Sequence, residues 1–179
     1  MIRPLTIVLC LASGLAMADT VTLAPAGGFQ FCIRNPSFCG PHAPANSTDM
    51  ALLVRVNRQV NDGILPDPLS TPDRKRAENG NWRVVTPGGL GGCVEYTWTK
   101  YMLLAWGGVP QGAMRFAQVH APGSDEDHAV LLVRVKGVEV VLDNLTPVIW
   151  PADLTKYEWL AVQDETNGLR WIKPDGVPK

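Results

Sequence analysis

Two strand-like runs in the second half of the chain constrain its fold most, because only two residues separate them. Residues 128–135 (HAVLLVRV) and 138–144 (VEVVLDN) are rich in β-branched and apolar side chains. The connection between them is Lys136-Gly137, and a two-residue loop that contains glycine is typical of a tight β-hairpin. The sequence therefore predicts an antiparallel pair of strands.

The register of this hairpin brings two polar residues together. It places Arg134 opposite Glu139, and this opposite-charge pair supports the register. Counted outward, the same register puts His128 and Asp143 on one face of the sheet as diagonal neighbours, roughly 7 to 8 Å apart between backbones. Side chains bridge such a gap, whereas a slip of one residue would put the two on opposite faces.

A cysteine opens the helix predicted before this hairpin. Cys93 follows Gly91-Gly92 and begins a helix that runs to about Ala105. In the first turn of a helix, unbonded N–H groups and the helix dipole lower the pKa of a thiol from about 8.5 to roughly 3.5 to 7.5. The two glycines let the backbone approach a substrate closely. This position suits a nucleophile better than a packing residue.

A cysteine, a histidine and an aspartate in this arrangement have the parts of a thiol peptidase. A thiolate at Cys93 attacks a carbonyl, and an imidazole at His128 keeps the thiol ionised and later protonates the leaving amine. A carboxylate at Asp143 fixes the tautomer of the imidazole. Of the three histidines, only His128 begins a predicted strand with an acid on the next strand.

The first eighteen residues are predicted to be an export signal. MIRPLTIVLCLASGLAMA has one positive residue, an apolar run, and a final Ala-Met-Ala that suits signal peptidase. The run is too short for a permanent membrane span, and it lacks the 3.6-residue period of the alternative, a buried amphipathic helix. Residues 19–179 are then expected to form a single domain in the periplasm or outside the cell.

The cysteine count adds to this prediction. Removal of the signal also removes Cys10, which leaves three of the four cysteines. Cys32 and Cys39 flank turn-forming residues and are expected to close a short disulfide loop in an oxidising compartment. Cys93 then keeps its thiol, which indicates a function. The alternative is a small buried residue without chemistry.

Composition excludes some classes of partner. The chain has 16 basic and 17 acidic residues and a formal charge of -1, without the excess of basic residues that nucleic acid or anionic lipid requires. Hydrophobic residues at 46% and charged residues at 18% are typical of a globular protein. We expect no nucleic-acid partner and no stable membrane insertion. Composition indicates no particular oligomeric state.

The rest of the chain is predicted more coarsely. Residues 19–45, rich in Gly, Pro and Ala, are expected to form an extended arm pinned by the disulfide. Residues 46–64 are expected to be helical, with a cap from Asn-Ser-Thr at 46–48. The apolar stripe of this helix consists of Leu52, Leu53, Val56 and Val60. Residues 65–92 are expected to form a long polar loop of the kind that is usually functional. From Trp150 on, one or two further strands are predicted.

Several motifs resemble those of the bacterial transglutaminase-like cysteine peptidases, a periplasmic group with adhesin-cleaving members. They are the cysteine pair near the start, VNRQVN, a loop tryptophan, GGCVEYTWTKYMLL, DHAVLLV and VLDN. The resemblance implies an α+β fold of the papain-like or transglutaminase-like kind, in which the helix that carries the cysteine packs on an antiparallel sheet. It also implies a catalytic triad, which falls on Cys93, His128 and Asp143.

The chain departs from this family around the cysteine. The family has an Asp before the cysteine and a Glu after it, whereas this chain has Gly92 and Val94, and only Glu95 remains acidic. The adhesin-cleaving members bind calcium through those acids, and a hard cation needs several oxygen ligands. We therefore expect no metal or other cofactor and weak or no calcium dependence. The acidic run at 125–127 is interpreted as a solvated loop rather than a substitute set of ligands.

Three further residues are candidates for the cleft, each with an ordinary alternative. Trp82 lines the cleft or covers the core, Glu95 orients the cleft or favours the helix start, and Asn144 positions the base or forms a turn. The main prediction is an exported thiol peptidase that cleaves a protein substrate such as a surface adhesin. A glutamine acyl transferase and a catalytically silent binding module of the same fold are the alternatives.

Overall fold

The computed structural model describes residues 20–47, 49–67 and 82–178. The predicted export signal and the middle of the long loop lie outside these residues. No helix among the described residues is both long enough and apolar enough to cross a bilayer.

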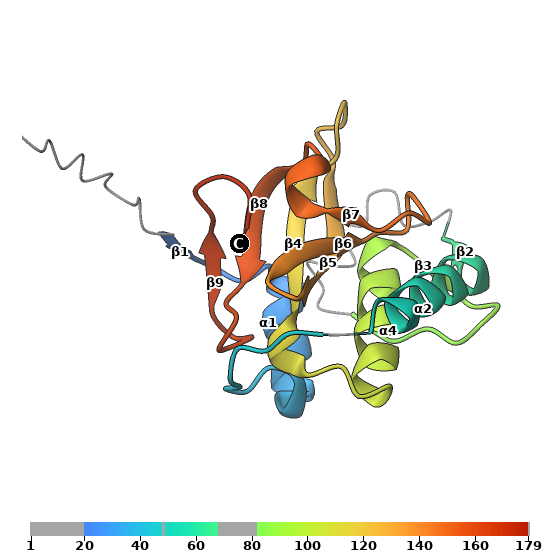
Figure 1. Cartoon of the computed structure of the whole chain (residues 1–179), viewed down its shortest axis with the longest axis horizontal. Helices are drawn as coiled ribbons and strands as arrows, with labels where there is room; N and C mark the ends of the chain where they lie inside the picture. Colours follow the sequence, from blue (N-terminus) through green and yellow to red (C-terminus); the bar gives the residue numbers. More distant parts are fainter. Residues whose placement is uncertain (1–19, 48, 68–81, 179) are drawn as a thin grey trace, which may run out of the picture.

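A seven-stranded antiparallel sheet forms the body of the protein, with the strand order β1-β9-β8-β4-β5-β6-β7 (Figure 1). Its strands are β1 (Thr20–Thr22), β4 (Met114–His120), β5 (Asp127–Val135), β6 (Val138–Leu142), β7 (Trp150–Pro151), β8 (Glu158–Gln163) and β9 (Trp171–Lys173). A separate parallel pair consists of β2 (Leu65–Pro66) and β3 (Leu90–Gly91). The end of the chain supplies three strands rather than one or two, because β7 has only two residues and little sequence signal.

β5 and β6 pair in the predicted register. Arg134 lies opposite Glu139, and their side chains are 3.0 Å apart between Nε and Oε1. Both loop residues have positive φ, 51° at Lys136 and 84° at Gly137, as a tight hairpin turn requires. Arg115 on β4 also contacts Glu139 at 2.8 Å. This buried ion pair ties the hairpin to β4, a strand for which the sequence predicts no regular structure.

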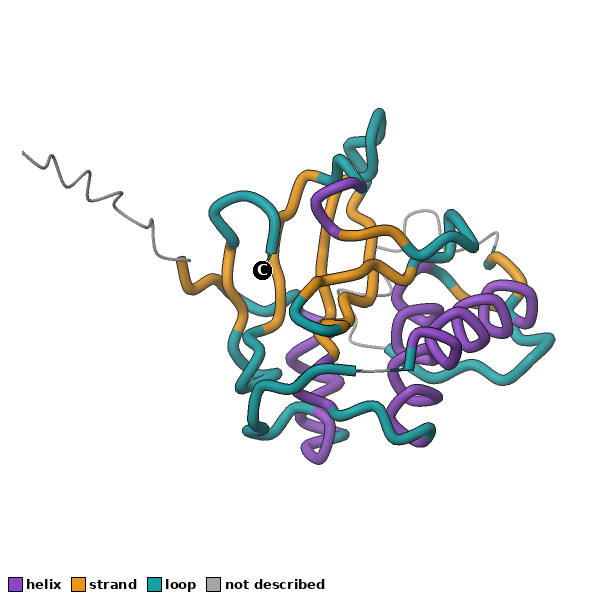
Figure 2. The backbone as a smooth tube through the Cα atoms, in the orientation of Figure 1, coloured by secondary structure: helices purple, strands orange, loops and turns teal. Residues whose placement is uncertain are grey.

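In the part of the chain that the structure describes, three α-helices share the larger hydrophobic core on one face of the sheet. They are α1 (Ala26–Arg34), α2 (Met50–Gly63) and α4 (Cys93–Trp106), with short 3-10 turns at Pro36–Phe38, Gln111–Ala113 and Ala152–Leu154. α4 packs against β5, and α2 lies beside α4 (Figures 1 and 2). α4 is buried on nearly all sides, and its buried residues include the charged side chains of Glu95 and Lys100. A smaller core around Trp159 covers the other face.

The extended arm predicted over residues 19–45 is wrong in part, because α1 lies within it. Glycines near the start of α1 are unfavourable in a helix. Tertiary packing overrides this preference, since Phe31 stacks on Trp98 with ring centroids 3.7 Å apart. A side chain at Gly28 would come within 3.0 Å of the Trp82 ring, so α1 lies this close to the core because position 28 is glycine.

α2 starts later than the predicted cap. Asp49 caps it, and its Oδ1 accepts a hydrogen bond from the Leu52 N–H at 2.8 Å. Asn46, predicted as part of the cap, instead accepts from the Gly137 N–H of the hairpin turn at 2.7 Å. The predicted apolar stripe is buried, and the helix ends at Gly63.

The expected disulfide joins Cys32 and Cys39, whose Cα atoms are 5.4 Å apart. It links the last part of α1 to the 3-10 turn that follows, and both residues are buried. Cys93 takes no part in a disulfide.

Candidate active site

Cys93 is the first residue of α4, and a side chain from the first turn of this helix bonds the backbone just before it. The Glu95 carboxylate turns back and accepts a hydrogen bond from the Gly92 N–H, with Oε2 and N 3.0 Å apart. A side chain at Gly91 would come within 2.9 Å of the Glu95 Cβ. The buried Cys93 thiol thus lies at the positive end of the helix dipole, where a thiolate is stabilised.

Thr97, one turn along α4, connects the helix start to β5. Its hydroxyl is within hydrogen-bond distance of the Cys93 carbonyl at 2.8 Å and of the Ala129 carbonyl at 3.1 Å. Ala129 directly follows His128 in the strand. The first turn of α4 therefore packs against the start of β5, next to His128.

His128 and Asp143 form a buried hydrogen-bonded pair. The distance from His128 Nε2 to Asp143 Oδ1 is 2.7 Å, and the two residues are 9% and 1% exposed. Because the carboxylate accepts the proton on Nε2, Nδ1 is the ring nitrogen that carries a lone pair in the neutral imidazole. This is the tautomer that a thiol peptidase needs in order to take a proton from its cysteine.

Further donors hold the Asp143 carboxylate. The Leu145 N–H donates to Oδ1 at 3.0 Å, and the Tyr157 hydroxyl donates to Oδ2. Burial raises the pKa of Asp143, but the bonds from His128, Tyr157 and Leu145 outweigh burial and lower the pKa below its usual value. Asp143 therefore remains ionised at neutral pH.

Lys100 is a buried charge on the same helix as Cys93. It lies seven residues after the cysteine and is only 1% exposed. Burial lowers its pKa to about 7, while the negative charge of Asp143 opposes that change. Sequence periodicity alone does not distinguish such a lysine from a solvated one.

Two asparagines of α2 anchor the chain that follows β6. Asn61 Nδ2 donates to the carbonyls of Asp143 and Thr146, at 2.9 and 3.3 Å. Asn57, which has no exposed surface, donates to the Pro147 carbonyl at 3.2 Å. Both asparagines belong to the VNRQVN motif, and their spacing of four residues on an otherwise apolar helix face is the signal that sequence reasoning missed.

A second histidine and carboxylate pair lies at the same end of the sheet. His120 Nε2 is 3.1 Å from Asp127 Oδ1, and Nδ1 is 3.6 Å from Glu158. All three side chains are at least partly exposed, so solvent screens their interaction. The buried pair of His128 and Asp143 is better suited to orient an imidazole for chemistry.

A family model described as bacterial transglutaminase-like cysteine proteinase BTLCP matches residues 18–177. The chain belongs to this family. It is therefore a transglutaminase-like cysteine peptidase. No curated protein is significantly similar to it in sequence.

Solved structures of Legionella pneumophila LapG resemble the peptidase in fold. One has a TM-score of 0.52 and 16% identity over 84% of this chain and 88% of LapG. A calcium-bound LapG structure has a TM-score of 0.52 and 17% identity over 72% of this chain and 71% of its own. An EGTA-treated one has a TM-score of 0.52 and 16% identity over 84% and 86%. These matches agree with the α+β architecture, in which the cysteine helix packs on an antiparallel sheet.

The remaining candidates for the cleft of this peptidase lie in different surroundings. Trp82 is 5% exposed and stacks on Phe116 with ring centroids 4.7 Å apart, so it covers the core. Glu95 lies at the helix start, as described above. Asn144 is half-buried, and its side-chain oxygen has no hydrogen-bond partner among the described residues.

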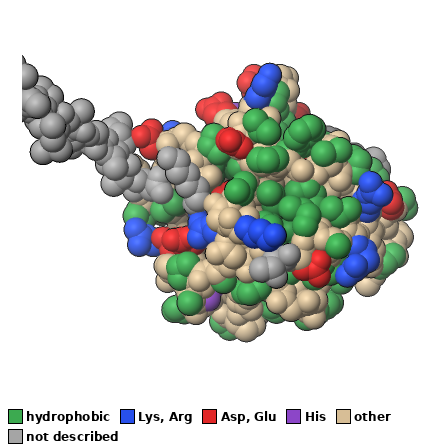
Figure 3. All heavy atoms as spheres, in the orientation of Figure 1, with side chains coloured by type: hydrophobic (Ala, Val, Ile, Leu, Met, Phe, Trp, Pro, Cys, Tyr) green, Lys and Arg blue, Asp and Glu red, His purple; other side chains and the backbone are tan. Residues whose placement is uncertain are grey.

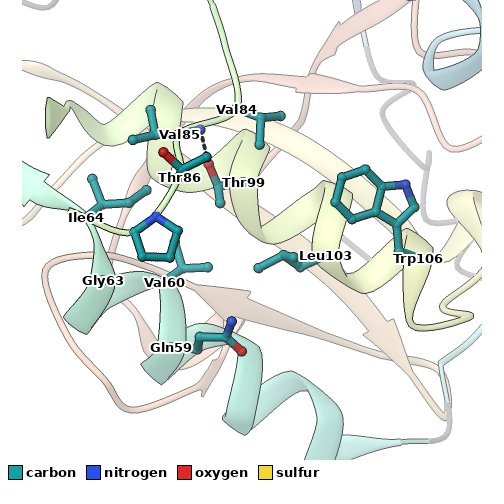
Figure 4. A pocket seen from close by; sticks show the side chains of 11 residues that line it. Gln59, Val60, Gly63, Ile64, Val84, Val85, Thr86, Thr99, Leu103 and Trp106 are labelled. Carbon is teal, nitrogen blue, oxygen red and sulfur yellow. Dashed lines mark hydrogen bonds between the residues drawn. The ribbon is translucent and has the colours of Figure 1, made fainter. Parts of the chain in front are cut away.

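A pocket of about 190 Å³ lies between α2, α4 and the segment before α4 (Figure 4). Its wall is mostly apolar, and the Val85 N–H donates to Thr99 Oγ1 at 3.0 Å beside it. Cys93, His128 and Asp143 are not among its lining residues. The pocket is therefore separate from the candidate active site.

Proposed function

We propose that this peptidase is an exported enzyme that cleaves a protein substrate with Cys93 as nucleophile, His128 as base and Asp143 as orienting carboxylate. The observation that carries the proposal is the buried hydrogen bond between His128 and Asp143 at 2.7 Å. The contact of Thr97 with both the Cys93 and Ala129 carbonyls supports the nearness of the cysteine to this pair.

In the proposed reaction, His128 Nδ1 takes the Cys93 proton, and the thiolate attacks the carbonyl carbon of the scissile bond. Backbone N–H groups at the start of α4 stabilise the oxyanion. The imidazolium then protonates the leaving amine, the C–N bond breaks, and an acyl-enzyme remains. A water molecule, deprotonated by His128, hydrolyses the thioester and releases the acid and the thiol.

A protein substrate needs an accessible surface next to the triad. Figure 3 shows hydrophobic side chains gathered on the face that carries β6 and β7 in Figure 1. Exposed apolar residues in the segment after Asp143 include Leu145, Val148, Trp150 and Leu154. Exposed apolar surface of this kind is typical of protein-binding sites. On the family resemblance, we propose a surface protein of the adhesin class as substrate.

The proposed location is the periplasm or the cell exterior. The export-signal pattern at residues 1–18 and the disulfide between Cys32 and Cys39 both support an oxidising compartment. N-terminal sequencing of the protein recovered from the periplasm is expected to begin at Asp19. Recovery of the protein in the cytosol with Met1 intact would contradict export.

We propose weak or no calcium dependence, because the described residues do not fit a calcium site. Gly92 and Val94 carry no side-chain oxygen, and Glu95 Oε2 accepts from the Gly92 N–H. Among the described residues, no group of three or more His, Cys, Asp or Glu is placed to hold a metal ion. Calcium takes about six to eight oxygen ligands.

The test is to treat the mature protein with iodoacetamide at neutral pH and to map the labelled cysteine by mass spectrometry. We expect fast alkylation of Cys93, much slower alkylation in His128→Ala, and loss of proteolysis in Cys93→Ala. Equal alkylation rates in the wild type and His128→Ala would show that Cys93 and His128 do not interact. Slow alkylation of the wild type, together with partner binding that persists in Cys93→Ala, would favour a catalytically silent binding module.

A further inference from the structure

The two oxygens of the Asp143 carboxylate have separate partners. Oδ1 accepts from His128 and from the Leu145 N–H, whereas Oδ2 accepts from the Tyr157 hydroxyl. Asp143 is 1% exposed, so solvent does not replace a missing donor. Within the described part of the chain, Tyr157 supplies the hydrogen bond to Oδ2. A buried charged oxygen without such a donor favours protonation of its carboxyl group.

The chain before Tyr157 is shaped to deliver this hydroxyl. Lys156 has a φ of 56°, a left-handed conformation that is unfavourable for a residue with a side chain. Thr155 donates to the Ala152 carbonyl at 2.7 Å and accepts from the Tyr157 N–H at 3.4 Å. The Tyr157 ring meets Trp159 edge to face, with centroids 6.0 Å apart. A strained turn and an aromatic neighbour thus fix the direction of the phenol.

We propose that Tyr157 is a positioning residue of the triad, whose hydroxyl holds Asp143 in the rotation that presents Oδ1 to His128 and keeps the carboxyl group ionised. This inference rests on the proposed function of Cys93, His128 and Asp143. Three donors on two oxygens fix the plane of the carboxylate, whereas donors on Oδ1 alone leave Oδ2 unsatisfied. A protonated Asp143 does not stabilise the imidazolium that forms during catalysis.

The electrostatics agree with this role. Burial and the bond to Asp143 raise the pKa of Tyr157 above its usual value, so the phenol remains a donor at neutral pH. Among the described residues, the other titratable groups that act on Asp143 are His128 from β5 and Lys100 from α4. From α2, Asn61 contributes only a neutral amide, which bonds the Asp143 carbonyl rather than its carboxylate.

The experiment is the rate of Cys93 alkylation by iodoacetamide between pH 5 and 9 in Tyr157→Phe, which keeps the ring and removes the hydroxyl. The loss of a hydrogen bond to a charged group costs enough free energy that we expect Cys93 alkylation in Tyr157→Phe to be about tenfold slower than in the wild type at pH 5 to 6. The acid limb of the profile should move to higher pH, because the pKa of Asp143 rises. Tyr101→Phe is the matched control, since it removes a largely buried hydroxyl that bonds the Phe38 carbonyl. It is expected to have the wild-type profile.

A double-mutant cycle separates positioning from general loss of structure. In Asp143→Asn, the added change Tyr157→Phe is expected to have little effect, because the carboxylate it supports is gone. Equal slowing in both backgrounds, or a Tyr157→Phe profile that overlays the wild type, would overturn the inference. If His128→Ala still slows alkylation in that case, the proposed triad survives. If His128→Ala also leaves the rate unchanged, the proposed function fails as well.

Discussion

The replacement of Lys100 by methionine is expected to make the protein more stable, and the gain should depend on pH. Lys100 is 1% exposed, and burial lowers its pKa from 10.5 to about 7. Methionine has nearly the same length and carries no charge to desolvate. Replacement of a buried charge by an apolar residue of similar volume is often neutral or stabilising.

The magnitude follows from the pKa values. A tenfold change in proton affinity corresponds to about 1.4 kcal/mol, so a drop from 10.5 to about 7 corresponds to roughly 5 kcal/mol. Water penetration and local relaxation reduce this figure, and we expect a gain of about 2 to 4 kcal/mol at pH 7 and below. The unfolded chain holds the Lys100 proton up to about pH 10.5, whereas the folded protein releases it above about pH 7. The destabilisation of the folded protein by Lys100 is therefore fully present below pH 7 and decreases as the pH rises towards 10.

The assay is urea unfolding of the wild type and Lys100→Met with the disulfide intact, at pH 6, 7, 8.5 and 9.5. The difference in unfolding free energy should be largest at pH 6 and 7 and should shrink by roughly 1.5 to 3 kcal/mol at pH 9.5. Lys173→Met is the control, because an exposed lysine is expected to change stability by less than about 0.5 kcal/mol at every pH. A Lys100→Met variant that is less stable than the wild type at pH 6, or a difference that does not vary with pH, would refute the reasoning.

Three other changes test the remaining parts of the structure. Cys32→Ser should lower the unfolding free energy by about 2 to 3 kcal/mol, as expected for a short closed loop, and leave the Cys93 alkylation rate unchanged; unaltered stability would mean that the disulfide is absent in solution. Asn61→Ala removes two hydrogen bonds and should cost about 1 to 3 kcal/mol in urea unfolding; a cost near zero would contradict the anchoring of the chain after β6. Calcium titration of the mature protein should leave its melting temperature unchanged, and a clear response at micromolar calcium would refute the proposal of weak or no calcium dependence.

The parts of the fold that sequence predicts best are those set by neighbours along the chain. The hairpin register depends on a two-residue turn and on the pairing of Arg134 with Glu139, both of which lie within a few residues. The same register places His128 near Asp143. The helix at Cys93 is likewise local, because two glycines and an apolar run define its start.

The parts that sequence misses depend on contacts between distant segments. α1 contains glycines that disfavour a helix, and its stacking on Trp98 from α4 is invisible in the local pattern. Tyr157 follows Asp143 by fourteen residues, and its approach depends on the left-handed turn at Lys156. Nothing in the composition of that segment indicates which side of the sheet it will cover.

The surroundings of Asp143 explain why a core should retain groups that lower its stability. Its carboxylate and carbonyl receive hydrogen bonds from α2, from β5 and from the segment before β8, and a buried lysine lies on α4. A core selected for stability alone would replace the lysine with an apolar residue and would have no need for a buried carboxylate. Buried charges with shifted pKa values are instead typical of sites where the chemistry of a reaction determines the residue. The cost predicted for Lys100 and the positioning proposed for Tyr157 are thus two consequences of one requirement, an ionised carboxylate held behind His128 in a dry interior.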